Sequence, residues 1–552
     1  MARTLRGFEG DMQRDRTRLR VSLRTVAVLI AVGLMPGPDT RAEAAPGSNS
    51  SQAKATPASP VSQAERLLAA GQVDAALTAA DAAIAADPES ARAHYVRGMV
   101  LERQKDLAAA AAEYTAALSR QPTAEAHDRL GFVLGLQGRT EDAIAEFQRA
   151  VALQPSLADA QYHLGATLWW TKQTGAARPA LERAVALRPA HAESRYYLGL
   201  VLRQEGELTG AIRELRRAVT LDPRLAVAHL QLGVALQESG DLDGAVGALD
   251  KAVSLDPSRP DAANSLGLAL MQRGDAARAI DTLRGVVTRH PDFGSARLNL
   301  GTALLQTGDI AGAAEVYREL TRREPANAEA FYDLGFTLKQ QDDFAGAEAA
   351  LRTALRLDET MPEAPYTLGV VLWQTGRGDE ALALFRQAVA RRPDFADAHY
   401  MMATVLKQQG DAASSLKELH ETIRINPGSA EAHNSLAQLL AAAGDMAGAA
   451  DASATAERLN KRKADSQAAV FAINAGKERL QRGEVAAAIA ELRKAVRLAP
   501  DSAEAHRQLA LALRRRGSHA EARTESEIAR RLAADPKLSG SGAAPGSPSR
   551  RW

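Results

Sequence analysis

Two adjacent stretches of the sequence decide its fold class. Residues 124–157 read AEAHDRLGFVLGLQGRTEDAIAEFQRAVALQPSL, and residues 158–191 read ADAQYHLGATLWWTKQTGAARPALERAVALRPAH. Both are 34 residues long and align without a gap, with Leu-Gly at positions 7 and 8, Ala at positions 20 and 27, and Pro at position 32. Self-similarity at a fixed period of this length predicts an array of structural repeats.

The same pattern continues in both directions along the chain. Leu-Gly recurs at steps of 34 residues from Leu130 to Leu368, and fourteen repeats are assigned. They start at residues 57, 91, 124, 158, 192, 226, 260, 294, 328, 362, 396, 430, 469 and 503. Position 20 is Ala in thirteen of them, with Ser415 as the exception, and position 32 is Pro in eleven. Such regularity predicts one continuous array.

This pattern resembles the tetratricopeptide repeat, and the resemblance covers nearly all of residues 57–536. It implies an all-α fold, a right-handed superhelical solenoid of about fourteen antiparallel helix pairs. In each pair we expect the Gly at position 8 to face the Ala at position 20. A Gly near position 15, such as Gly138, permits the left-handed turn that ends the first helix, and the Pro at position 32 ends the second helix.

The resemblance also implies a concave groove lined by first-helix positions 2, 5, 9, 12 and 13. Six of the nine tyrosines lie at position 5, and three of the four tryptophans lie at positions 12 and 13. Tyr and Trp offer apolar area together with one polar group, which suits a binding surface. The candidate partner-binding residues are Tyr162, Trp169, Trp170, Tyr196, Tyr332, Phe336, Tyr366, Trp373 and Tyr400. The alternative that the position-5 tyrosines only pack helices together stays open.

Two recurring polar positions favour structural roles. Six of the eleven histidines lie at position 4: His94, His127, His229, His399, His433 and His506. One His in each repeat cannot chelate a metal ion, whose bonds to nitrogen are about 2 Å long, so we expect half-buried packing residues and no metal or other cofactor. Carboxylates at position 2, such as Asp159 and Glu363, start the first helices, where negative charge stabilises the helix end.

The N-terminal segment has the features of a secretory signal peptide over residues 1–44. Basic residues precede an apolar stretch from Thr25 to Met35, and Ala42-Glu43-Ala44 offers a cleavage site. The stretch is shorter than the roughly 20 residues that span a bilayer, so no membrane span is expected after cleavage. We therefore expect a periplasmic or secreted protein, whose start at Met1 or at Met12 stays open. Residues 45–60 read as a flexible linker and residues 537–552 as a disordered tail.

The spacing of repeats slips by five residues after the twelfth. Repeats 1–12 occupy residues 61–460, and repeats 13 and 14, with a capping helix, occupy residues 469–536. No Gly or Pro lies between Gly448 and Gly476, so residues 461–468 are either an irregular junction or the extension of a helix that joins repeats 12 and 13.

Composition restricts the function classes. There is no Cys, and Lys plus Arg (68) balance Asp plus Glu (67), so thiol chemistry and a general attraction to nucleic acid are not expected. No phosphate-binding or zinc-protease motif is present, and the repeats leave no room for a catalytic domain. We expect a non-enzymatic scaffold of the bacterial envelope that binds protein or peptide partners in its groove. The alternative is an assembly or carrier factor for exported polysaccharide or another envelope complex.

Overall fold

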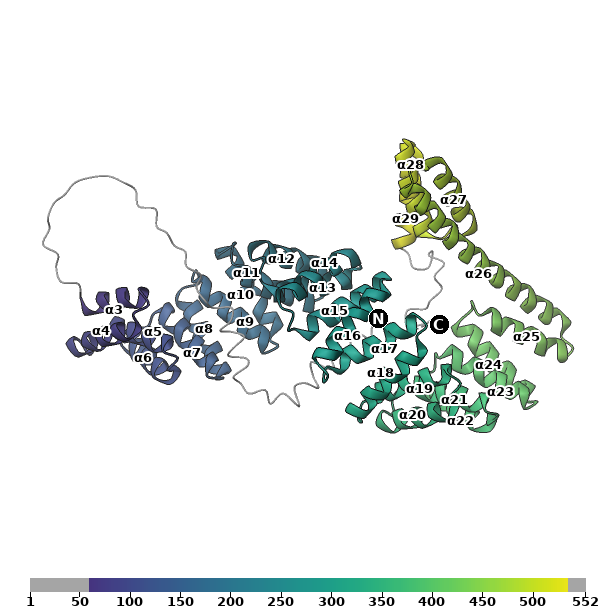
Figure 1. The fold of residues 1–552 in the computed structure, drawn as a ribbon, viewed down its shortest axis with the longest axis horizontal. Coiled ribbons are helices and arrows are strands. Elements are labelled where there is room, and N and C mark those ends of the chain that lie inside the picture. The colour runs from purple at the N-terminus through teal and green to yellow at the C-terminus, as the bar shows by residue number, and fades with distance from the viewer. Residues whose placement is uncertain (1–58, 535–552) are drawn as a thin grey trace. The chain divides into compact units, whose positions relative to one another are not determined.

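The computed structural model describes residues 59–534, and this range is helical throughout, with 27 helices and no strand. The predicted signal peptide, most of the predicted linker and the predicted tail lie outside the described residues. Successive helices pack against each other in pairs, as Figure 1 shows, and the predicted all-α solenoid of helix pairs is confirmed. The chain divides into two compact parts, residues up to Ala303 and residues from Leu304 onward.

The N-terminal part contains seven complete helix pairs and most of one further helix. Its helices are α3 (Pro60–Ala69), α4 (Val73–Ala86), α5 (Ala91–Arg103), α6 (Leu107–Arg120), α7 (Ala124–Leu136), α8 (Thr140–Leu153), α9 (Ala158–Trp170), α10 (Thr174–Leu187), α11 (Ala192–Gln204), α12 (Leu208–Leu221), α13 (Ala226–Ser239), α14 (Leu242–Leu255), α15 (Pro260–Arg273), α16 (Ala276–Arg289) and α17 (Gly294–Gln306), which ends beyond Ala303.

The C-terminal part contains the remaining helices. They are α18 (Ile310–Arg323), α19 (Ala328–Gln340), α20 (Phe344–Leu357), α21 (Glu363–Gln374), α22 (Gly378–Arg391), α23 (Ala396–Gln408), α24 (Ala412–Ile425), α25 (Ala430–Ala442), α26 (Met446–Gln481), α27 (Val485–Leu498), α28 (Ala503–Arg516) and α29 (His519–Ala534).

Capping residues start many of the helices, and residues with a positive φ form the turns between them. Asp241 caps the start of α14, because its side chain accepts a hydrogen bond from the Gly244 amide at 3.0 Å. The preceding turn passes through Gly240, whose φ of 84° lies in the left-handed region. Within residues 59–534, three turns place a residue other than glycine in this region: Lys105, Lys172 and Asp342.

The expected contact between Gly at position 8 and Ala at position 20 is only partly right. A Cβ atom built on Gly233 of α13 would lie 2.4 Å from Cγ of Leu249, at position 24, and 3.2 Å from the carbonyl oxygen of Ala245, at position 20. The side chain that fills the space above the glycine is therefore the one at position 24. It lies one turn beyond position 20 on the same helix face, and a longer side chain there reaches across the gap.

Small or branched apolar residues at positions 3 and 10 of the first helix join successive repeats. Ala398, at position 3 of α23, is fully buried in a cluster with Ala388 and Val389 of the preceding helix. Val100, at position 10 of α5, is fully buried in a cluster with Ala76. Burial at these two positions therefore stabilises the stacking of repeats.

Helix α26 interrupts this pairing, because it runs without a break from Met446 to Gln481. Its first half packs against α25 as the second helix of repeat 12, and its second half packs against α27 as the first helix of repeat 13. Of the two alternatives for residues 461–468, the structure has the helix extension (Figure 1).

Candidate partner-binding surface

An aromatic cluster joins two neighbouring first helices of the N-terminal part. Trp169 and Trp170 end α9, and Tyr197 lies on α11. The rings of Trp169 and Trp170 meet edge to face with centroids 5.1 Å apart, and Trp169 meets Tyr197 in the same way at 5.7 Å. The indole nitrogen of Trp170 donates a hydrogen bond to the Tyr197 hydroxyl at 3.2 Å. We call these three residues the tryptophan cluster.

The members of the tryptophan cluster differ in exposure. Trp170 is 38% exposed, whereas Trp169 is half-buried against the core of this part. The Nε1 atom of Trp169 is buried and has no hydrogen-bond partner among the described residues. An unsatisfied buried donor costs about 1–3 kcal/mol, so the orientation of the Trp169 ring is held at some cost in stability.

Tyr162 was predicted to line the binding groove, but the structure buries it. It is only 8% exposed, with its ring edge-on to His191 at 4.9 Å and 5.9 Å from the ring of Tyr197. Burial raises the pKa of its hydroxyl well above the usual range. Tyr162 therefore packs against Tyr197 of the cluster and offers little surface to a partner.

A buried contact between a histidine and an aspartate lies next to Tyr162. The Nδ1 atom of His163 on α9 lies 2.8 Å from Oδ1 of Asp128 on α7, and the imidazole ring lies 5.3 Å from the ring of Tyr162. Burial alone lowers the pKa of His163, but the charge and hydrogen bond of Asp128 outweigh it and raise the pKa. The contact therefore links two successive first helices, α7 and α9.

Tyr196 lies half-buried beside the cluster, with its ring 5.0 Å from that of Tyr197. Tyr197 was missed by the sequence analysis because it occupies position 6, outside the positions that the family resemblance implies. Its contact with Trp170, at position 13 of the preceding repeat, depends on how the repeats are stacked. The only signal in the sequence is the Tyr196-Tyr197 pair itself.

The candidate residues of the C-terminal part are half-buried. Tyr332 and Phe336 stack with centroids 6.4 Å apart, and the Lys339 ammonium lies 4.8 Å from the Phe336 ring. Burial lowers the pKa of Lys339. Tyr366 lies between Phe385, at 6.0 Å, and Phe395, at 4.8 Å, so it mainly packs helices together.

Polar side chains join neighbouring first helices along the same face. The Trp373 indole nitrogen donates to Oε1 of Gln408 at 2.9 Å, and the Tyr400 hydroxyl lies 3.4 Å from that of Ser435. In each case the residues are 35 positions apart, one repeat and one residue. These contacts hold the aromatic groups in fixed orientations.

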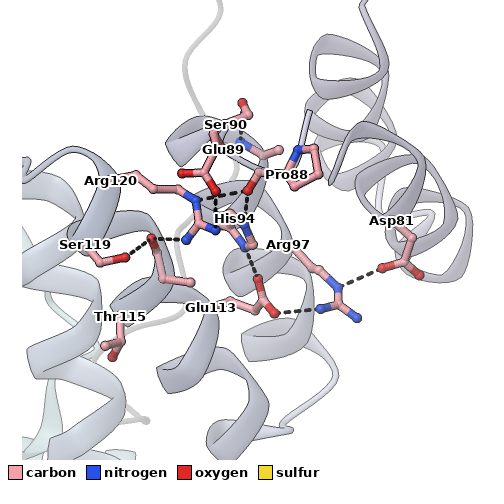
Figure 2. A network of polar contacts seen from close by, with 12 residues as sticks. Asp81, Pro88, Glu89, Ser90, His94, Arg97, Glu113, Thr115, Ser119 and Arg120 are labelled. Atoms are coloured by element: carbon pink, nitrogen blue, oxygen red, sulfur yellow. Dashed lines mark hydrogen bonds and ion pairs between the residues drawn. The ribbon is translucent and has the colours of Figure 1, made fainter. Parts of the chain in front are cut away.

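Four of the position-4 histidines, His94, His127, His399 and His506, contact a glutamate on the second helix of their repeat, and the prediction of half-buried packing residues missed this role. Figure 2 shows His94 between the Pro88 carbonyl, 3.1 Å from Nε2, and Glu113, 2.7 Å from Nδ1. Arg97 then joins Glu113 to Asp81. The imidazole therefore links the turn before its own helix to the second helix of its repeat.

The same arrangement recurs at position 4 of other repeats. His399 and His506 each contact a glutamate 19 residues later and a proline carbonyl six residues earlier. Arg195 takes the same place in its repeat, with Glu214 at 2.5 Å and the Pro189 carbonyl at 2.8 Å. Histidine and arginine are thus interchangeable here as donors to the same two acceptors.

Two of the position-2 carboxylates, Asp159 and Glu363, form ion pairs within their own repeats. Arg188 donates to both oxygens of Asp159 at 2.8 and 3.0 Å, and Arg392 donates to Glu363 at 3.0 Å. Both arginines lie 29 residues after their partners, at the end of the second helix. The carboxylates lie in the first turn of α9 and α21, and each also ties that turn to the end of the second helix of its repeat.

Residues 59–534 contain neither a cluster of potential metal ligands nor a helix of membrane-spanning character. No three His, Cys, Asp or Glu side chains in this range are grouped as a metal ion would require. No helix in the same range has both the length and the apolar character needed to span a bilayer.

Stacked helix pairs define the class of this protein, an α-solenoid, and comparison with known families gives a narrower assignment. Models described as tetratricopeptide repeat or TPR repeat match residues 61–125, 133–170, 171–226, 202–268 and 476–517. A model described as the C-terminal domain of cilia and flagella-associated protein 70 matches residues 259–473. The chain is a tetratricopeptide-repeat protein.

Solved structures of similar proteins cover parts of the chain. YrrB, described as a TPR protein with an unusual peptide-binding site, is 28% identical, with 33% of this chain and 95% of YrrB covered at a TM-score of 0.31. MamA is 26% identical, with coverages of 30% and 96% and a TM-score of 0.29. The C-terminal part of a repeat protein from Cytophaga hutchinsonii is 20% identical, with coverages of 44% and 98% and a TM-score of 0.37. No curated protein matches this chain.

Proposed function

We propose that this chain is a non-catalytic scaffold that binds protein partners through the tryptophan cluster of α9 and α11. The observation that carries the proposal is the exposed Trp170 indole, which Tyr197 holds by a hydrogen bond of 3.2 Å. A large ring fixed at the surface loses little conformational freedom on binding, and Trp and Tyr are enriched among the residues that dominate binding energy.

The half-buried Trp373 and Tyr400 of the C-terminal part extend the proposal to a second surface of the same kind. No feature of the described residues favours polysaccharide as the ligand. We also propose a periplasmic or secreted location, which rests on the sequence of residues 1–44 alone.

The experiment compares three forms of the tagged chain in cells: native, Trp170→Ala and Leu153→Ala. Leu153 is a matched control, because it is 54% exposed and lies on a second helix, α8, away from the cluster. A captured protein is then purified, and its affinity for each form is measured by calorimetry. We expect binding about tenfold or more weaker for Trp170→Ala and unchanged for Leu153→Ala. Equal affinity of all three forms would overturn the assignment of the surface.

A further inference from the structure

The middle of α26 has an exposed surface that the rest of the array does not share. Between residues 457 and 468 every side chain is exposed or half-buried. Two ion pairs join this segment to neighbouring elements, Arg462 with Asp501 at 2.7 Å and Lys463 with Glu431 at 3.9 Å. The three most exposed large apolar side chains among the described residues lie on the same helix: Phe471 (76%), Met446 (67%) and Val470 (56%).

The sequence of repeat 13 explains why its face is open. Phe471 and Glu478 occupy positions 3 and 10, where the regular repeats bury small or apolar residues such as Ala398 and Val100. A phenyl ring and a carboxylate do not fit the closely packed contact with a preceding repeat. The first described repeat shows how this chain treats a face that contacts water, because its position 10 is the exposed Arg66. Repeat 13 differs, because the residue at its position 3 is the exposed aromatic Phe471.

The exposed stripe that contains Phe471 has the spacing of a helix-pairing seam. Small or apolar residues form its centre at alternating steps of four and three positions: Ala464, Ala468, Phe471 and Ala475. Charged residues continue it with the same alternation: Glu457 and Lys461 toward the N-terminus, Glu478 and Arg482 toward the C-terminus. A seam with this spacing packs against a second helix, and charges beside an apolar centre select the partner and its direction.

We propose that this stripe binds the same stripe of a second copy of the chain, with the two α26 helices antiparallel about a two-fold axis. Phe471 then meets Ala468 of the partner subunit, a large side chain against a small one. Lys461 meets Glu478 of the partner subunit, and Glu457 meets Arg482 of the partner subunit. The two residue numbers of each pair add to the same total, as a two-fold axis requires.

The charges also select the direction of pairing. A parallel arrangement in the same register would place Lys461 against Lys461 of the partner subunit and Glu478 against Glu478 of the partner subunit, which repel each other. The antiparallel arrangement converts both contacts into attractions. One helix from each chain forms the interface, so association is weak and depends on protein concentration.

The test is sedimentation velocity on the full chain over about a hundredfold range of concentration. We expect the native chain to shift from monomer to dimer. Phe471→Asp lowers the affinity about tenfold or more, because it places a charge at the centre of the contact.

Exchanged charges test the direction of pairing. Glu478→Lys weakens association, because it places a lysine against Lys461 of the partner subunit. Combining it with Lys461→Glu restores association, since the attraction is rebuilt with its signs exchanged. Arg458→Glu is the matched control, because Arg458 is exposed on the same segment but lies off the stripe.

All the substituted positions are exposed, so we expect each variant to keep its helices. Circular dichroism of each variant checks this expectation. A native chain that stays monomeric throughout would overturn the proposal and leave a different protein as the occupant of the stripe. Failure of the exchanged charges to restore association would also overturn it, as would an Arg458→Glu variant that weakens association as much as Glu478→Lys.

Discussion

Gly233 on α13 and Leu249 on α14 lie so close that a Cβ atom on Gly233 would be 2.4 Å from Cγ of Leu249. The same Cβ atom would lie 3.2 Å from the Ala245 carbonyl, so a simple rotation of the Leu249 side chain does not relieve the crowding completely. The absence of a side chain at Gly233 is therefore what allows α13 and α14 to pack at this distance.

Gly233→Ala is expected to destabilise the N-terminal part by about 1–3 kcal/mol, because the added methyl group overpacks the interface. The measurement is the shift of the chemical unfolding midpoint. Gly247→Ala is the control: Gly247 lies in α14 with nothing within 4 Å of the added Cβ atom, and alanine favours a helix by about 1 kcal/mol over glycine. A change of stability in the same direction for both substitutions would contradict the proposed overpacking at Gly233.

Lys105→Gly is expected to stabilise the repeat formed by α5 and α6 by about 1 kcal/mol. Lys105 has a φ of 65°, a left-handed conformation that costs a side-chain-bearing residue about 1–2 kcal/mol and glycine almost nothing. Thermal unfolding of both proteins measures the effect. Lys105→Ala removes the charge but keeps the Cβ atom, so it should bring no such gain. Equal stabilisation by both variants would show that removal of the lysine charge, and not relief of the left-handed conformation, is the cause.

His399 is expected to make the stability of α23 and α24 depend on pH. The hydrogen bond to Glu418 raises the pKa of His399 in the folded state, and the Pro393 carbonyl accepts from the other ring nitrogen. A raised folded-state pKa means that this stabilisation is complete below the unfolded-state pKa of about 6.5 and is lost as the pH rises through the folded-state value. Hydrogen-exchange protection of α23 and α24, corrected for intrinsic rates, measures the loss.

His399→Arg is the matched control for this effect, because Arg195 makes the same two contacts at the same position of its own repeat. Arginine stays charged across the range, so protection of α23 and α24 in this variant should not fall between about pH 6 and 8. An equal fall in both proteins would show that His399 is not the responsible group.

The recurring Leu-Gly, Ala and Pro positions predicted an array of repeats from the sequence, and their resemblance to the tetratricopeptide repeat supplied the prediction of helix pairs. The lack of Gly and Pro after Gly448 indicated a helix extension as one of two alternatives, and α26 is continuous there. These features depend on periodicity and local backbone preference, which a single sequence displays directly.

Contacts between helices were harder to predict. The glutamate partners of His94 and His399 lie 19 residues later in both cases, so the sequence held a signal that was not used. The contact between Trp170 and Tyr197 follows from the stacking of two repeats, and no spacing rule within one repeat contains it. Tyr162 was placed in the groove by its position alone, whereas neighbouring rings bury it.

The measurement that tests the central claim most directly is site-specific photocrosslinking in cells, with the photoreactive residue at position 170 in one protein and at position 153 in another. Both positions are exposed, but only Trp170 belongs to the tryptophan cluster. The account predicts a discrete crosslinked protein partner from position 170 and none from position 153. The same partner crosslinking equally from both positions, or only from position 153, would contradict the proposal that the chain binds its partner through this cluster.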